Sequence, residues 1–331
     1  MKKILLLGMA IFTLLLGACS TGGSQSVGAE NGKVEYPKQP IELIVPFAPG
    51  GSTDIGARIL EKYLPKYLPD AQIVVVNKPG GSGTIAMSDL FKSKPDGYTL
   101  SLATHRATAM QPLYGKTKYK HDSFQPIAKV FGNQQILVVK GDAPWETFEE
   151  WFDYVESNPN VFTVGVSGGV GSGSHLPMAE LEMLAGLKTK PVPFEGTPPA
   201  ITAILGGHVQ GAILQPSDAK SFIESGQLRA IFNAGSVPVP YFPEIPLLID
   251  KGFDISYDSN TSLLAPKGVP QEIVEILQEA VKKTMEDPEV LAEFEKANLQ
   301  VQLGSAEVVQ EELDEENAKS AVILKNLGLI K

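Results

Sequence analysis

The chain has 331 residues, of which 43% are hydrophobic and 20% are charged, and its formal net charge is -10 at pH 7. This composition is that of a globular protein with enough apolar residues for a sizeable core, and the length suits two domains. It excludes wholesale disorder and a polytopic membrane protein. The negative charge disfavours nucleic acid and anionic membrane surfaces as partners.

The N-terminus has the pattern of an export signal. Lys2 and Lys3 precede an apolar run over 4–16, which is shorter than the roughly 20 residues that a membrane-spanning helix needs. The run ends in Leu-Gly-Ala-Cys, which resembles the lipobox of bacterial lipoproteins, where the cysteine is lipidated. We therefore predict a signal peptide over 1–18 and, over 19–37, a lipid anchor at Cys19 followed by a flexible tether. The folded part would lie outside the cytoplasm, on the outer face of the cytoplasmic membrane or in a periplasm.

Apolar segments typical of strands alternate with helical patterns along the rest of the chain. The sequence predicts strands over 41–47, 73–76, 98–103, 135–139, 162–166 and 228–233, and mainly helices from residue 270 onward. Thr147 and Glu150 have the spacing of a capping box at a helix start. This alternation favours an α/β fold with a mostly parallel sheet. The return of the chain after about residue 236 would complete a discontinuous first lobe.

Two strands end in glycine-rich loops about 120 residues apart, and each loop leads into a helix. The first loop contains Gly50, Gly51, Ser52, Thr53 and Asp54, and the second spans 168–173. Backbone N–H groups at such a helix start lack intrahelical partners and face the positive end of the helix dipole, which favours anions. Hydroxyl groups in both loops add donors. Two facing loops of this kind would hold two carboxylates of one ligand.

The helix after the second loop has its own predicted features. Ser174 is the candidate N-cap residue, and Leu176, Ala179, Met183 and Leu184 are the predicted buried face.

Other interpretations of the loops remain open or are weaker. The glycines could simply serve turns with positive φ. Neither loop has the Gly-Lys-Ser/Thr ending of a P-loop, and the glycine spacing in the second loop does not match a dinucleotide fold. Ser172 and His175 could form a nucleophile and base, although capping and ligand contact explain this spacing better. The four histidines lack the spacing of a metal site, and no cofactor is indicated. We therefore expect a binding protein and not an enzyme.

Several motifs together resemble the extracytoplasmic solute receptors of the tripartite tricarboxylate transporter system, the TctC or Bug family. These motifs are Val-Pro-Phe-Ala-Pro-Gly-Gly-Ser-Thr-Asp at 45–54, Asn-Lys-Pro-Gly-Gly-Ser-Gly at 77–83 and Asp-Gly-Tyr-Thr-Leu at 96–100. In the second half Gly-Ser at 171–172, His-Leu at 175–176 and Val-Pro-Phe at 192–194 follow the same pattern. The similarity runs from about residue 38 to the C-terminus.

The resemblance implies a two-lobed periplasmic-binding-protein fold of type II-like topology, with the ligand cleft between the lobes. Lobe 1 would comprise 38–136 and 237–331, and lobe 2 would comprise 137–236. The receptor would act as a monomer that captures a small di- or tricarboxylate, citrate-like by default, and delivers it to large and small integral membrane subunits. The alternative is a ligand sensor on the same scaffold that feeds a signalling protein. The ligand-binding residues carried over are Gly50, Gly51, Ser52, Thr53, Asp54, Ser172, Gly173, Ser174 and His175.

This chain departs from the family pattern after its third predicted strand. Thr104, His105 and Arg106 stand where small or polar residues are usual, so Thr104 and Arg106 join the candidate ligand-binding residues. An Arg106 that faces the cleft could pair with a ligand carboxylate, whereas a solvated Arg106 would play no part in binding. We expect Asp54 to cap its helix, because its charge would repel an anionic ligand. Glu195 and Gln210 also differ from the family pattern, so analogy does not identify the ligand.

Overall fold

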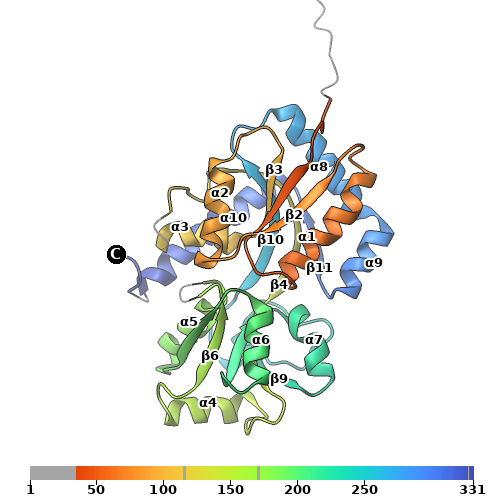
Figure 1. The fold of residues 1–331 in the computed structure, drawn as a ribbon. Coiled ribbons are helices and arrows are strands. Elements are labelled where there is room, and N and C mark those ends of the chain that lie inside the picture. The colour runs from red at the N-terminus through yellow and green to blue at the C-terminus, as the bar shows by residue number, and fades with distance from the viewer. Residues whose placement is uncertain (1–34, 115–116, 170–171, 327) are drawn as a thin grey trace, which may run out of the picture. The chain divides into compact units, whose positions relative to one another are not determined.

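Two separate β-sheets organise the chain in the computed structural model, which describes residues 35–114, 117–169, 172–326 and 328–331 (Figure 1). The predicted signal peptide, Cys19 and most of the tether lie outside the described residues. Sheet A has the strand order β11 (Gln300–Gly304), β4 (Phe124–Gln134), β10 (Asp258–Pro266), β3 (Thr99–Thr104), β1 (Ile41–Val45), β2 (Ile73–Asn77). Sheet B has the order β7 (Lys190–Phe194), β6 (Thr163–Ser167), β8 (Gly211–Leu214), β5 (Ile136–Lys140), β9 (Leu228–Asn233).

Helices cover both faces of each sheet. Those packed on sheet A are α1 (Ser52–Tyr63), α2 (Thr84–Lys92), α8 (Gln271–Glu286), α9 (Pro288–Lys296) and the first part of α10 (Ala306–Asn326). Those packed on sheet B are α4 (Phe148–Ser157), α5 (Leu176–Ala185), α6 (Thr197–Leu205) and α7 (Pro216–Glu224). The short elements are α3 (Gln111–Tyr114), the 3-10 turns η1 (Leu64–Lys66), η2 (Gly81–Gly83) and η4 (Ile249–Lys251), and the π-helical η3 (Arg106–Met110).

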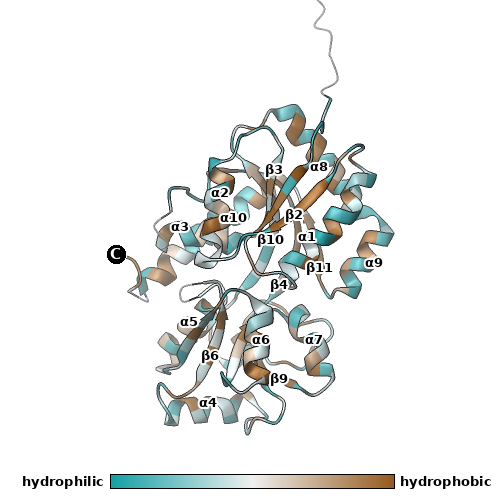
Figure 2. Cartoon of the chain, viewed as in Figure 1, coloured by the Kyte–Doolittle hydropathy of each residue, from teal (hydrophilic) through white to brown (hydrophobic). Residues whose placement is uncertain are grey.

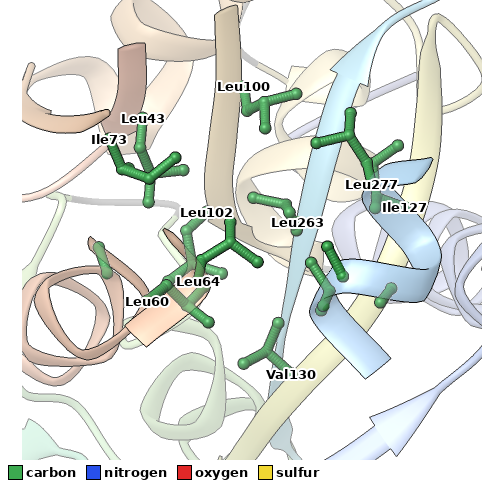
Figure 3. Packing of buried hydrophobic residues seen from close by; sticks show 14 of the residues in the cluster. Leu43, Leu60, Leu64, Ile73, Leu100, Leu102, Ile127, Val130, Leu263 and Leu277 are labelled. Atoms are coloured by element: carbon green, nitrogen blue, oxygen red, sulfur yellow. The ribbon is translucent and has the colours of Figure 1, made fainter. Parts of the chain in front are cut away.

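Alternating side chains of the strands divide the apolar residues between two layers on each sheet. In β10 Leu263 packs with the helices on one face of sheet A, whereas its neighbour Leu264 packs with those on the other. Figure 3 shows the first of these layers, in which Leu60 of α1 and Leu277 of α8 lie against the strands. In Figure 2 strands β1 and β2 are mainly brown, while α1 and α9 carry teal residues. The sheets therefore form two buried cores of α/β architecture.

The chain passes between the two sheets repeatedly. Strand β4 of sheet A leads directly into β5 of sheet B, and the segment after β9 returns to β10. Helix α10 also contacts both cores, because Leu313 packs in a cluster of sheet A while Ile323 and Leu324 pack in a cluster of sheet B with Trp151. Among the described residues, no helix has the length and hydrophobicity needed to cross a membrane.

The structure corrects two sequence predictions about the fold. The sheets are mixed and not mostly parallel, because β10 runs antiparallel to β3 and β4, and β5 runs antiparallel to β8 and β9. Met183 and Leu184, predicted to be buried, are 40% and 50% exposed, and α5 buries Met178 and Leu181 instead. The predicted capping box is confirmed, since Thr147 and Glu150 exchange both hydrogen bonds at the start of α4.

Candidate functional site

A cleft opens where strands of both sheets end. Its lining follows the carboxyl ends of β1 and β3 in sheet A and of β6, β7 and β8 in sheet B, which is where α/β proteins place ligands. The empty space amounts to about 670 Å³ and includes open solvent. Eight of the predicted ligand-binding residues line it: Gly51, Ser52, Thr53, Thr104, Arg106, Ser172, Gly173 and Ser174. Gly50, Asp54 and His175 are not among its lining residues.

Asp54 shapes the first loop and does not line the cleft. Its Oδ2 atom accepts hydrogen bonds from the Gly50 backbone N–H at 2.8 Å and from Arg58 Nε at 3.0 Å, and its Oδ1 accepts one from Asn77 Nδ2 at 2.9 Å. Burial would raise the pKa of Asp54, but these hydrogen bonds outweigh burial and hold the pKa below its ordinary value. The carboxylate therefore uses the N–H of Gly50, which is not available to a ligand in this arrangement.

Ser52 and Thr53 begin α1 and are both buried. The Ser52 hydroxyl donates a hydrogen bond of 2.7 Å to Oε1 of Gln215, the residue that precedes α7 at the end of β8. Ser52 thus joins the loop of sheet A to an element of sheet B. Its hydroxyl oxygen can still accept a hydrogen bond, and Thr53 places a further hydroxyl at the same wall of the cleft.

The second loop supplies hydroxyl groups from β6 and the turn after it. Ser172 and Ser174 lie with their Oγ atoms 3.1 Å apart, and Ser174 donates a hydrogen bond of 2.7 Å to the carbonyl oxygen of Ser167. Ser174 was predicted to cap α5, and this prediction is wrong: the residue at the N-cap position is His175, which makes no side-chain cap. The Ser174 hydroxyl closes the loop back onto the strand instead.

Arg106 is the one charged side chain among the described residues that line the cleft. Its side chain is buried, with 5% of the residue exposed, so it is not a solvated surface group. The guanidinium lies 4.5 Å from the centre of the Tyr257 ring, and Nη2 donates to the Asp258 carbonyl oxygen at 3.1 Å. Nε and Nη1 have no hydrogen-bond partner among the described residues, although Glu316 lies 3.9 Å from Nη1. Buried N–H donors of this kind are suited to a ligand anion.

The residues on either side of Arg106 have structural partners. Thr104 accepts a hydrogen bond from the Ala107 N–H at its Oγ1. His105 is not among the lining residues; its Nε2 lies 2.7 Å from the Ser262 hydroxyl, and burial with Lys129 and Arg106 nearby lowers its pKa to about 3. His105 is therefore neutral at physiological pH and adds no charge to the site.

His175 was predicted from the second loop to contact ligand, and it lies just outside the cleft lining. Burial lowers the pKa of its imidazole below the ordinary value, so the ring is neutral at pH 7. No group of three or more His, Cys, Asp or Glu side chains in the described part of the chain could hold a metal ion.

Seven polar residues of the lining were missed by sequence reasoning: Ser82, Gln111, Gln135, Ser167, Thr197, Gln215 and Ser259. Ser82 lies in the Asn-Lys-Pro-Gly-Gly-Ser-Gly motif, and its hydroxyl donates a hydrogen bond to the carbonyl oxygen of Gly168 in the second loop. The motif therefore carried a signal for Ser82. The other six residues lie at strand ends, within β10 or at helix starts, where the sequence has no comparable pattern.

The two sheets, their crossovers and the cleft between them define a two-lobed periplasmic-binding protein. A relative in Cupriavidus necator, the "UPF0065 protein in gbd 5'region", is 31% identical over 323 residues, which is 96% of both chains. The solved periplasmic binding protein BugD is 28% identical, with a TM-score of 0.83 over 89% of this chain and all of that one. MatC from Rhodopseudomonas palustris, solved with bound malate, is 27% identical, with a TM-score of 0.81 over 87% of this chain and 100% of that one.

The model of the tripartite tricarboxylate transporter family receptor, TctC, matches residues 57–329. The chain belongs to this family. It is accordingly an extracytoplasmic solute-binding receptor and not an enzyme.

Proposed function

We propose that this receptor captures a small di- or tricarboxylate, citrate-like, and delivers it to the large and small integral membrane subunits of a tripartite tricarboxylate transporter. The observation that carries the proposal is the buried Arg106, whose Nε and Nη1 have no hydrogen-bond partner among the described residues of a cleft lined with hydroxyls. The relative MatC, solved with malate, supports a carboxylate ligand.

The arrangement of the helices adds to this support. α1 begins at Ser52, α6 begins at Thr197 and α7 begins just after Gln215, and all three of these residues line the cleft. Helix starts present N–H groups and positive dipole ends, so they favour an anion when a charged partner is also present. Arg106 supplies that partner. We assign the ligand contacts to Gly51, Ser52, Thr53, Thr104, Arg106, Ser172, Gly173 and Ser174.

The hydrogen bonds that these residues can make to ligand carboxylates are strong enough for capture. Hydrogen bonds to charged groups contribute about 1.5 to 3 kcal/mol each, so five or six of them can offset the cost of association and reach the roughly 8 kcal/mol of a micromolar complex.

The wider cellular arrangement is part of the same proposal. A signal peptide over 1–18 and a lipid on Cys19 would anchor a monomeric receptor to the membrane through the tether. Lobe 1 would comprise 38–136 and 237–331 and lobe 2 would comprise 137–236, with capture by movement of the lobes about the crossovers.

Thermal unfolding of the chain from Lys33 onward, which contains the compact unit 35–331, tests the proposal. Malate, citrate and succinate, and their fully amidated, uncharged analogues, would be added in turn. A ligand at 100 times its dissociation constant stabilises the folded protein by about 2.7 kcal/mol, which raises the melting temperature by several degrees. Calorimetry on the acid with the largest shift would give the affinity. Equal shifts for the acids and their uncharged analogues, with no heat of binding, would refute a carboxylate receptor.

A further inference from the structure

A second carboxylate, that of Asp218, lies behind the cleft lining. Asp218 is in the first turn of α7, in sheet B, and is not itself a lining residue. It interacts with the backbone N–H of Ser52, which belongs to the loop of sheet A, and with the hydroxyl of Thr197 at the start of α6, and it lies near the Ser52 hydroxyl that donates to Gln215. Its Oδ2 atom is buried without a hydrogen-bond partner among the described residues. The carboxylate is thus buried by residues from both sheets.

No charged side chain among the described residues offsets the charge of Asp218. The titratable group that faces it is Tyr241, whose own pKa is raised by burial, by Asp218 and by Glu224. On the same helix, Lys220 and Glu224 lie 3.8 Å from each other, and Lys220 lies over the Tyr241 ring. Burial is the largest influence on Asp218 and raises its pKa to about 6, although Thr197 and Ser52 oppose this shift.

Contact between the lobes creates this environment. The hydrogen bond from Ser52 to Gln215 holds the loop of sheet A against the start of α7, next to Asp218. If the lobes separate, the Ser52 loop leaves α7 and water reaches the carboxylate. An ionised Asp218 therefore costs more in the closed arrangement than in an open one.

We propose that Asp218 is a positioning residue that meets the ligand-binding loop at Ser52 when the lobes close, and that closure takes up a proton at its carboxyl group. This inference rests on the proposed function, because closure is what captures the ligand. The charge on Asp218 opposes closure, and the proton removes that opposition. Capture is then stronger in a mildly acidic medium than in a neutral one.

The sign and size follow from the pKa of the two states. A solvated Asp has a pKa near 3.9, and the closed state has a pKa of about 6. The closed state therefore binds more protons between pH 4 and 6, so affinity rises as the pH falls through 6 and is level above it. Between pH 7 and pH 5 the affinity rises about tenfold. Only the interval below the closed-state pKa of about 6 contributes, and pH 5 lies one unit below it, which corresponds to a factor of ten.

Asp218→Asn removes the charge and keeps the shape. We expect this variant to bind malate, or whichever carboxylate stabilises the wild type most, more tightly at pH 7 and to lose the tenfold rise toward pH 5. Titration of the ligand and of His175 remains in both proteins, so the difference between the two profiles isolates Asp218. Glu272→Gln, an exposed position in the first turn of α8, is the control and should keep the wild-type profile. Identical affinities and profiles for Asp218→Asn and wild type would overturn the proposal.

A disulfide between the lobes gives a test that needs no ligand. A Cβ added at Gly168 would lie 3.6 Å from Cβ of Ser82, within the range of disulfides, so Ser82→Cys with Gly168→Cys should lock the contact between the lobes. Cysteine at position 168 is strained, because φ there is +81°, at a cost of about 1 to 3 kcal/mol.

The carboxyl titration of Asp218 would then be followed by NMR with carbon-13-labelled aspartate and assigned with Asp218→Asn. The proposal expects a pKa near 6 in the oxidised protein and a lower one after reduction. The same pKa in both forms would overturn it. If no acid binds the wild type, the proposed function fails while this measurement still decides the role of Asp218.

Discussion

Gly173 of the second loop packs directly on the side chain of Arg106, because a Cβ added at Gly173 would lie 2.2 Å from Cδ of Arg106. The two residues come from opposite sheets and both line the cleft. Gly173→Ala should therefore prevent the loops from approaching and weaken ligand binding about tenfold or more, with little change in the unfolding of the free protein. Calorimetry and thermal unfolding would measure the two effects.

The matched control for Gly173→Ala is Gly206→Ala, at the C-cap of α6, where φ is -78° and an added Cβ would lie closest to the exposed His208 side chain, at 3.0 Å, and 3.3 Å from the Thr202 carbonyl oxygen. This variant should bind as the wild type does. If Gly173→Ala binds equally well, the packing of Gly173 on Arg106 has no part in capture.

Arg106→Gln should weaken binding of a dicarboxylate by about ten- to a hundredfold, which is the loss of one charge-assisted contact of about 1.5 to 3 kcal/mol. Arg106→Lys should recover part of this loss, because it restores the charge without the planar group that lies over Tyr257. The dissociation constants of the three proteins, at two salt concentrations, would separate charge from geometry. Unchanged affinity in Arg106→Gln would remove this residue from the site.

The double variant Thr53→Ala with Ser172→Ala removes one hydroxyl from each wall of the cleft. We expect at least about a tenfold loss of affinity, since each hydrogen bond to a charged group contributes about 1.5 to 3 kcal/mol. Circular dichroism and thermal unfolding would show that the fold persists. Wild-type affinity in the folded double variant would contradict the proposed grip by the two loops.

Asp54 links loop geometry to pH. Its pKa is lowered in the folded protein, so its contribution to stability is complete above the ordinary pKa of an aspartate and is lost as the pH falls through the folded-state value. Asp54→Asn should lose about 1 kcal/mol at pH 7, the difference between charged and neutral hydrogen bonds, and should show a shallower loss of stability in acid. Chemical denaturation from pH 7 to pH 3 would measure both. Parallel curves for the two proteins would exclude this role.

Thr147→Ala tests the fold away from the cleft. The variant removes the side chain that accepts the Glu150 N–H at the start of α4 and should lower the free energy of unfolding by about 1 kcal/mol. Ligand affinity should not change, because α4 does not line the cleft. Denaturation and calorimetry together would check the two expectations.

The sequence predicted those parts of the molecule in which local pattern decides the structure. Glycine-rich loops after β1 and β6 indicated the two walls of the cleft, because a strand, a glycine turn and a helix follow one another within a few residues. The capping box at Thr147 was recognisable for the same reason. In contrast β10 begins with a polar run, Asp-Ser-Asn-Thr-Ser, which gives no apolar pattern although most of these residues are buried in the sheet. Its antiparallel pairing was therefore not foreseen.

The candidate site depended on contacts between distant segments. The sequence left the environment of Arg106 open, because Tyr257 and Asp258, which hold it in the cleft, are about 150 residues further along the chain. Ser174 had the right position for a cap, but the carbonyl of Ser167 was a competing partner that only the folded loop brings near. Gln215 gained its role through Ser52 of the other sheet. Such pairings follow from the assembled fold and not from spacing.

Helix α10 has a mechanical consequence for any rearrangement of the two sheets. It is 21 residues long, or about 30 Å, and is anchored in one core through Leu313 and in the other through Ile323 and Leu324. Its Asn317 amide also donates to the carbonyl of Ala109, three residues beyond Arg106. The helix is therefore a rigid third connection between the two sheets, beside the β4–β5 connection and the segment that joins β9 to β10. Any rotation of one sheet relative to the other must bend α10, shift it, or separate one of its ends from the core. The packing of the residues at the two ends of α10 therefore limits how far the cleft can open.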